Sequence, residues 1–185
     1  MVVSPTNIID GLFLILKANV TSLNKVIRTY DKKASLHLFK GIRKTLPLDA
    51  FPSLEMEPVS GGMDWITTSA QSGEYVIDCV LTVNVGQEIE KGVDYISNLT
   101  RKITKIFNYP QNMSWEIPNE WLDKECTIPI FCQYSDIRSV DYLSSKDFSI
   151  RVARFQIVCK TTEPFPEPGN LLGPARVEWK RDEIS

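Results

Sequence analysis

The clearest pattern in the chain is the alternation of apolar and polar residues from Gly73 to Val85. Because successive side chains of a strand point to opposite faces, one face of this segment is entirely apolar. At about 3.3 Å per residue the strand would span about 40 Å, so amphipathic helices must cover that face. The apolar face is formed by Tyr75, Ile77, Cys79, Leu81, Val83 and Val85.

Three segments have the spacing of amphipathic helices. After the start signal Ser4-Pro5, apolar residues recur at intervals of three and four up to about Tyr30, which predicts a long helix. Residues 86–108 repeat this spacing, with acidic residues in the first turns and basic residues near the end, as the helix dipole favours. A third helical piece is predicted from Ala34 to Leu46, ended by Pro47.

Two shorter strand patterns lie before the long strand. Residues 53–59 alternate, and Pro58 places them at a sheet edge or strand end. Ser60-Gly61-Gly62 is predicted to be a turn, and residues 63–70 a strand that reaches the long strand through a second turn at residues 71–73. These segments together predict a hairpin or a three-stranded meander.

Two more strands are predicted in the second half of the chain. Residues 127–133 are strand-like, and residues 148–160 form the second strong strand pattern. The apolar set of this strand changes phase near Ala153, which implies a bulge or burial on both sides. Arg151 and Arg154 are then expected on the face that reaches water or a partner.

The loop 111–125 and the C-terminal residues are candidates for contacts with other molecules. Trp115 and Trp121 lie in the loop, where they either cap a core edge or act as contact anchors. From residue 163 the chain is rich in proline, which indicates an extended, semi-rigid arm, with a disordered tail as the alternative. The end of the arm alternates again, with Val177 and Trp179 on one side, so it can add to a sheet edge of its own copy or a neighbour.

The patterns predict an α+β fold with one core domain, residues 1–162, and an extended arm, residues 163–185. We expect a mostly antiparallel sheet of four to five strands packed with two main helices. The length of 185 residues fits one domain of this kind.

Charge is unevenly distributed along the chain, although the formal net charge is only −2. Residues 25–44 are strongly basic and residues 49–94 strongly acidic. Such a chain can attract copies of itself or a charged neighbour; the alternative is two solvated faces that differ by chance. The balanced total gives no field that would draw nucleic acid or an anionic membrane. The first residues form neither a signal peptide nor a membrane span, so we expect the protein in the cytoplasm where it is made.

The search for catalytic or metal-binding patterns favours no enzyme, cofactor or metal. His37 is the only histidine and has no evident partner residues. Glu55 and Glu57 share a strand face that we interpret as solvated, and Asp78 is expected in an ion pair with Arg151 or Arg154. The cysteines have no metal or redox spacing and are read as buried thiols in a reducing compartment. They are Cys79, Cys126, Cys132 and Cys159.

Four segments carry a family resemblance: LPLDAFPSLEMEP, GEYVIDCVLTVNV, EIEKGVDYISNLTRKITKIF and RVARFQIVCK. In their order along the chain and their pattern of apolar and polar residues, over about residues 5–162, these segments resemble the tail terminator, or tail completion, proteins of long-tailed bacteriophages. The resemblance implies a structural virion protein, without cofactor or catalytic residues, that forms a hexameric ring. The ring would cap the tail tube and join it to the neck, with the tail tube protein and a neck or connector protein as partners.

Ring closure suggests where this chain makes contacts. Heterologous contacts join different patches of successive copies, and we expect them at the loop 111–125 and the arm 163–185. The candidate interface residues are Trp115, Trp121, Arg151, Arg154, Phe165 and Trp179. The chain is longer than the smaller family members, which leaves open another neck role such as a head-tail connector. The alternatives from other classes are a small cytoplasmic ligand-binding or enzymatic α+β domain and a monomeric interaction adaptor.

Overall fold

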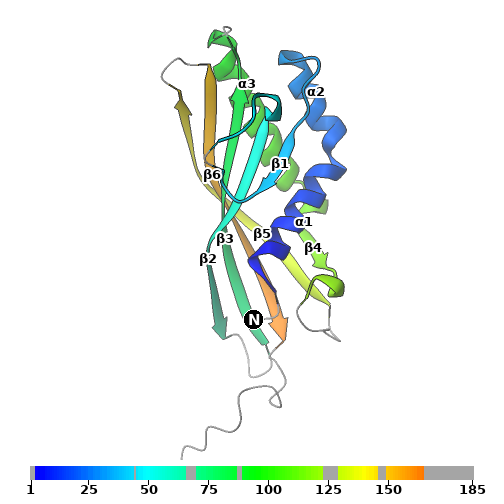
Figure 1. The fold of residues 1–185 in the computed structure, drawn as a ribbon. Helices are drawn as coiled ribbons and strands as arrows, with labels where there is room; N and C mark the ends of the chain where they lie inside the picture. Colours follow the sequence, from blue (N-terminus) through cyan, green and yellow to red (C-terminus); the bar gives the residue numbers. More distant parts are fainter. Residues whose placement is uncertain are drawn as a thin grey trace, which may run out of the picture.

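The computed structural model describes residues 3–43, 45–65, 70–86, 89–122, 129–145 and 149–164. Its main feature is a twisted sheet with helices along one side (Figure 1). The predicted α+β class is confirmed. Within the described residues the sheet has six strands in the order β1-β2-β3-β6-β5-β4, so the expected count of four to five strands is wrong.

The strand bounds show why the count was too low. The six strands are β1 (His37–Lys40), β2 (Ser53–Trp65), β3 (Ala70–Asn84), β4 (Ser114–Ile117), β5 (Ile130–Ser144) and β6 (Ile150–Pro164). β1 runs parallel to β2, whereas the other neighbouring pairs are antiparallel. The sheet is therefore mixed, and β1 and β4 are short strands that the pattern did not predict.

The helices are α1 (Pro5–Ala18), α2 (Val20–Tyr30) and α3 (Ile89–Phe107). The predicted helix up to Tyr30 is divided at Asn19, whose side-chain nitrogen donates to the Ile15 carbonyl 2.9 Å away and caps α1. Ser4 and Asn7 form a capping box at the start of α1, as the start signal indicated. The described part of the chain thus contains three α-helices where two main ones were predicted.

The helical piece predicted for residues 34–46 is wrong, because this segment contains β1. Leu38 pairs with Leu54 of β2. In a segment this short, pairing with a neighbouring strand overrides the local preference for a helix. The basic side chains of the segment also do not form one face. Lys40 lies 2.6 Å from Asp10 of α1, and the Arg43 guanidinium lies 4.1 Å from the centre of the Phe39 ring.

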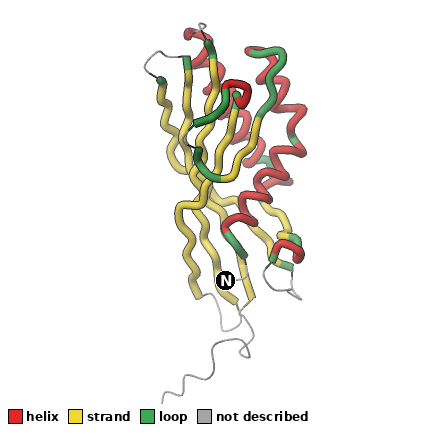
Figure 2. Tube along the Cα trace, viewed as in Figure 1, coloured by secondary structure: helices red, strands yellow, loops and turns green. Residues whose placement is uncertain are grey.

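Of the two predicted alternatives, the hairpin is confirmed by the antiparallel pairing of β2 with β3, and the three-stranded meander is wrong. β2 continues through Pro58 and Gly61-Gly62, and β3 already includes residues 71–73. The pairing register shifts between Pro58 and Ser60, so Val59 is an extra residue on β2. A bulge of this kind bends a strand without ending it, and the sheet twists strongly about halfway along its strands (Figure 2).

Of the two alternatives predicted for residues 148–160, the bulge is wrong, and burial on both sides holds at Ile157 and Val158, which are both buried on opposite faces of β6. The bulges lie in the neighbouring strand. β6 pairs with β3 without a register shift from Ile150 to Pro164. β5 instead shifts twice, between Tyr134 and Asp136 and between Arg138 and Val140. These bulges break the alternation of β5, which explains why only its start was recognised from the sequence.

The core lies between the helices and the apolar face of β3. The residues predicted for this face are buried from Tyr75 to Val83, and Val85 is half-buried. Cys79, Cys132 and Cys159 are buried free thiols, as expected, while Cys126 lies outside the described residues. Burial is the first cause that raises the pKa of Cys79 and of Cys132, which keeps these thiols protonated and unreactive.

The end of β6 is tied to the start of the chain by Glu163. This fully buried carboxyl accepts hydrogen bonds from the Tyr75 hydroxyl at 2.7 Å, the Thr161 hydroxyl at 3.0 Å and the Val3 amide at 3.2 Å. Glu163 and Pro164 therefore belong to the sheet, although the predicted arm began at residue 163. Residues 165–185 lie outside the described residues.

Candidate assembly surface

The second half of β5 is an exposed strand edge. β4 pairs only with Ile130–Gln133, and the described strands leave the outer side of residues 136–144 without a partner. Val140, Tyr142 and Leu143 are 38%, 53% and 49% exposed on this segment. An exposed edge with apolar side chains is a template for pairing with another chain. Sequence reasoning missed these residues because two bulges hide their strand pattern.

A second open edge lies on the other side of the sheet, in β2. β1 pairs with Ser53–Met56, so none of the described strands covers residues 57–65. Val59, the bulged residue, is 55% exposed. Pro58 lacks an amide hydrogen and Glu57 is exposed, two features that discourage indiscriminate pairing of an edge. The two open edges are thus different in sequence and shape.

The outer face of the sheet, opposite the helices, carries charged side chains on neighbouring strands. Glu74 lies 3.4 Å from both Arg138 and Lys160. The Gln156 amide donates to Asp78 Oδ1 at 2.7 Å, so Asp78 has an amide partner where an arginine was expected. On the same face Val76 and Val158 are paired and buried, so the face is not uniformly polar.

The structure places Arg151 and Arg154 on opposite faces of β6. Arg154 is exposed on the outer face, opposite Asp141 of β5. Arg151 is half-buried against α3, where a Cβ added at Gly92 would lie 3.1 Å from its Cγ. Of the two candidate interface residues, only Arg154 is therefore accessible from the outer face.

Trp115 and Trp121 pack against the core, so the structure places both on a core edge. Trp115 belongs to β4, and its indole lies directly on Gly11 of α1. Trp121 is in a short 3₁₀ helix, Asn119–Trp121, and its carbonyl accepts from Asn7 Nδ2 at 2.7 Å. Both side chains are half-buried. Phe165 and Trp179, the other two candidates, lie outside the described residues.

The residues considered for chemistry do not converge. The His37 ring stacks on Phe39 with centroids 6.4 Å apart. Glu55 is buried and its Oε2 accepts from the Arg43 amide at 3.0 Å, while Glu57 is exposed, which corrects the reading of both as a solvated face. Among the residues described, no group of three or more His, Cys, Asp and Glu side chains could hold a metal ion.

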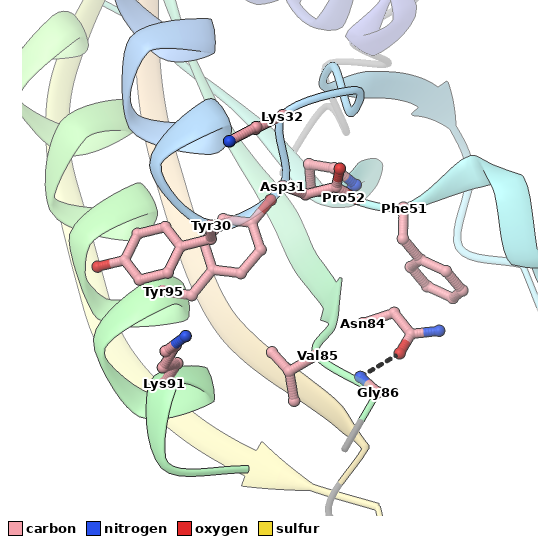
Figure 3. Close-up of a pocket in the computed structure, with 10 residues that line it drawn as sticks. All are labelled: Tyr30, Asp31, Lys32, Phe51, Pro52, Asn84, Val85, Gly86, Lys91 and Tyr95. Carbon is pink, nitrogen blue, oxygen red and sulfur yellow. Dashed lines mark hydrogen bonds between the residues drawn. The ribbon is translucent and has the colours of Figure 1, made fainter. Parts of the chain in front are cut away.

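A cavity of about 560 Å³ lies where α2 ends and α3 begins (Figure 3). Its wall includes Tyr30 and Tyr95, whose rings stack at 4.5 Å. Burial first, and then the nearby Asp31 charge, raise the pKa of Tyr95. Asp31 is the one carboxylate among its described lining residues, accompanied by Lys32 and Lys91. This composition could hold a small polar molecule, although His37 is not part of it.

A basic groove of about 390 Å³ runs between α2 and α3. Its cationic side chains are Lys25, Arg101, Lys102 and Lys105. The described lining residues include no Asp or Glu. The groove therefore combines one residue of the predicted basic stretch with three from the end of α3, and it faces away from the outer face of the sheet.

None of the helices in the described ranges is long and apolar enough to cross a membrane. A scan against protein-family models finds no match to this chain, and a search of curated proteins finds none either.

Proposed function

We propose that this chain is a structural virion protein of a long-tailed bacteriophage, a tail terminator that forms a hexameric ring. The ring caps the tail tube and joins it to the neck, so its partners are the tail tube protein and a neck or connector protein. Assembly would begin in the host cytoplasm and end in the virion. The resemblance of the sequence segments supports the family, and the exposed strand edges support self-assembly.

The observation that carries the proposal is the open edge of β5 at residues 136–144. Backbone groups on this edge have no described strand to pair with, and three apolar side chains lie exposed beside them. Covering about 100 Å² of apolar surface contributes about 2.5 kcal/mol at 25 cal/mol per Å². An edge of this length therefore gains substantially from a neighbouring copy.

The proposed contact is heterologous, because the open edges of β5 and β2 differ. Residues 136–144 of one copy would meet residues 57–65 of the next, and repetition of such a contact closes a ring when the rotation between copies permits it. The basic groove and the charged outer face give each copy two further surfaces of different character. These surfaces suit the faces that a ring offers to the tube and the neck.

Charge placed on the β5 edge tests the proposal. Tyr142→Glu and Leu143→Glu should shift the full chain from a ring-sized species to the monomer in sedimentation velocity, because a buried unpaired carboxylate opposes association. Both side chains are about half exposed, so the folded monomer should keep its circular dichroism spectrum and melting temperature.

The matched control is Val93→Glu on α3, since Val93 is 57% exposed and far in sequence from either edge. This variant should assemble like the parent chain. Unchanged assembly of both edge variants would remove the β5 edge from the account, and a monomeric parent chain would contradict the proposal itself.

The cavity where α2 ends and α3 begins supports a second candidate, a small ligand-binding domain. Its volume of about 560 Å³ is within the range of small-molecule sites. A monomeric chain whose melting temperature rises with a polar metabolite, and whose Tyr95→Phe variant loses that rise, would favour this candidate over the ring.

A further inference from the structure

β1 is a sheet edge of a different kind from those of β2 and β5. Its register with β2 runs from His37 to Lys40 without a shift, and it contains no proline. The amides of His37 and Gly41 donate to the carbonyls of Pro52 and Met56 at 2.9 and 2.8 Å. Because backbone groups alternate along a strand, those of Leu38 and Lys40 face away from β2. This edge is regular enough to accept another strand.

A pocket of about 260 Å³, lined mainly by apolar residues, lies beside this edge. It is formed where α1 meets α2, next to β1, and its lining residues are Leu16, Lys17, Val20, Leu23, Leu36, His37 and Leu38. Val20 is 41% exposed there. Leu38 is paired with the buried Leu54, so its side chain is on the helix side of the sheet. A strand added beside Leu38 would point alternate side chains into this pocket.

The chain itself contains a segment with the required pattern. Residues 175–180 read A-R-V-E-W-K, and on a strand Val177 and Trp179 share one side. We propose that this segment of one copy adds as a strand to β1 of a neighbouring copy, with Trp179 in that pocket. Main-chain hydrogen bonds to Leu38 and Lys40 hold the strand, and the pocket selects the aromatic side chain.

The reach of the segment favours a neighbouring copy over its own. β6 ends at Pro164, which pairs with Ala70, whereas β1 ends at Lys40, which is level with Cys79 of β3. Pro164 and Lys40 are nine residues apart along the strands and three strand spacings apart across the sheet, which places them about 33 Å from each other. The chain from Pro164 to Ala175 would be about 34 Å long in a polyproline II conformation. The segment could therefore reach β1 of its own copy only if this part of the chain were straight.

This exchange of the C-terminal segment between copies rests on the proposed ring, which supplies the neighbouring copy. The ring itself does not require the exchange. The contacts at the β5 edge could close a ring without the C-terminal segment. The exchange would link copies by a tether in addition to an edge contact, and linked contacts raise the effective affinity without enlarging either surface.

Photo-crosslinking within the full-length chain tests the exchange. The variant Trp179→p-benzoylphenylalanine keeps a large apolar ring at this position and forms covalent bonds with its neighbours on illumination. Copies labelled with heavy isotopes are mixed with light copies, and crosslinked peptides are identified by mass spectrometry. We expect heavy-to-light crosslinks from position 179 to residues 16–38.

Charge in the pocket provides the matched comparison. Val20→Glu should lower the crosslink yield about tenfold or more, because a carboxylate would then have to be covered by the aromatic side chain that enters the pocket. Val93→Glu, on α3 and outside the pocket lining, should leave the yield unchanged.

The oligomeric mass of the same sample separates the two proposals. A ring with heavy-to-light crosslinks to residues 16–38 supports the exchange. A ring whose crosslinks lie elsewhere, or only within one copy, overturns the exchange and leaves the proposed function standing. A monomer without heavy-to-light crosslinks overturns both.

Discussion

The contact between Gly11 and Trp115 permits a prediction in which the usual effect of a substitution changes sign. Gly11 lies within α1, where Gly→Ala normally stabilises a helix by about 0.5–1 kcal/mol. A Cβ at this position would overlap the indole of Trp115, at 2.7 Å from Cε2. Overpacking of this kind costs about 1–3 kcal/mol. Gly11→Ala should therefore destabilise the protein by a net amount of up to about 2.5 kcal/mol.

A double-mutant cycle isolates this contact. In a Trp115→Ala background the indole is absent, so Gly11→Ala should stabilise the protein by about 0.5–1 kcal/mol. The coupling between the two positions should then be about 1–3 kcal/mol. Free energies of unfolding from urea titrations of the four proteins provide the measurement, provided that the denaturant slopes agree.

Gly92→Ala on α3 is the control, because an added Cβ is less crowded at Gly92 than at Gly11. A Cβ there would lie 3.1 Å from the Cγ of Arg151, a flexible side chain that can move. Its effect should be smaller than that of Gly11→Ala. If Gly11→Ala stabilises the parent protein, Trp115 does not rest on α1 and the loop 111–125 is free to bind a partner after all.

Two further predictions concern buried tyrosines. Tyr75→Phe removes the hydroxyl that donates to Glu163 at 2.7 Å, and it should lower the free energy of unfolding in urea by about 1–3 kcal/mol. Tyr142→Phe, at an exposed position, should change this free energy by less than about 0.5 kcal/mol. Equal effects of the two substitutions would contradict the hydrogen bond between Tyr75 and Glu163. Burial, followed by the charge of Asp136, raises the pKa of Tyr134 to about 12, compared with about 10 in the unfolded chain. The folded state then holds this proton more tightly, so stability should fall as the pH rises from about 10 through 12, and Tyr134→Phe should make that fall shallower.

Elements with an unbroken period were predictable from the sequence. β3 alternates without interruption and α3 keeps one apolar stripe. Both appear near their predicted positions, although β3 begins at Ala70, before the predicted start at Gly73. The break of the first helix at Asn19 was not predictable, because apolar spacing continues across it and a single side-chain cap decides the bend.

Elements that depend on distant partners were the ones missed. β1 has four residues and is a strand because β2 lies beside it, which a local pattern cannot indicate. β5 carries two bulges that interrupt its alternation, so the exposed edge at Val140, Tyr142 and Leu143 was hidden. Pro58 and Gly61-Gly62 suggested breaks, but a bulge lets β2 continue through them.

The packing of the tryptophan residues also required the structure. Their sequence context favoured a core edge and left contact anchors as the alternative. The glycine beneath Trp115 and the Asn7 hydrogen bond to the Trp121 carbonyl place both on the core edge.

Native mass spectrometry of the full-length chain tests the central claim, assembly through open sheet edges, most directly. Six copies of the 21.0 kDa chain would weigh about 126 kDa, and the account predicts this species for the parent chain and its loss in Leu143→Glu. A parent chain that remains at 21.0 kDa at micromolar concentrations would contradict it.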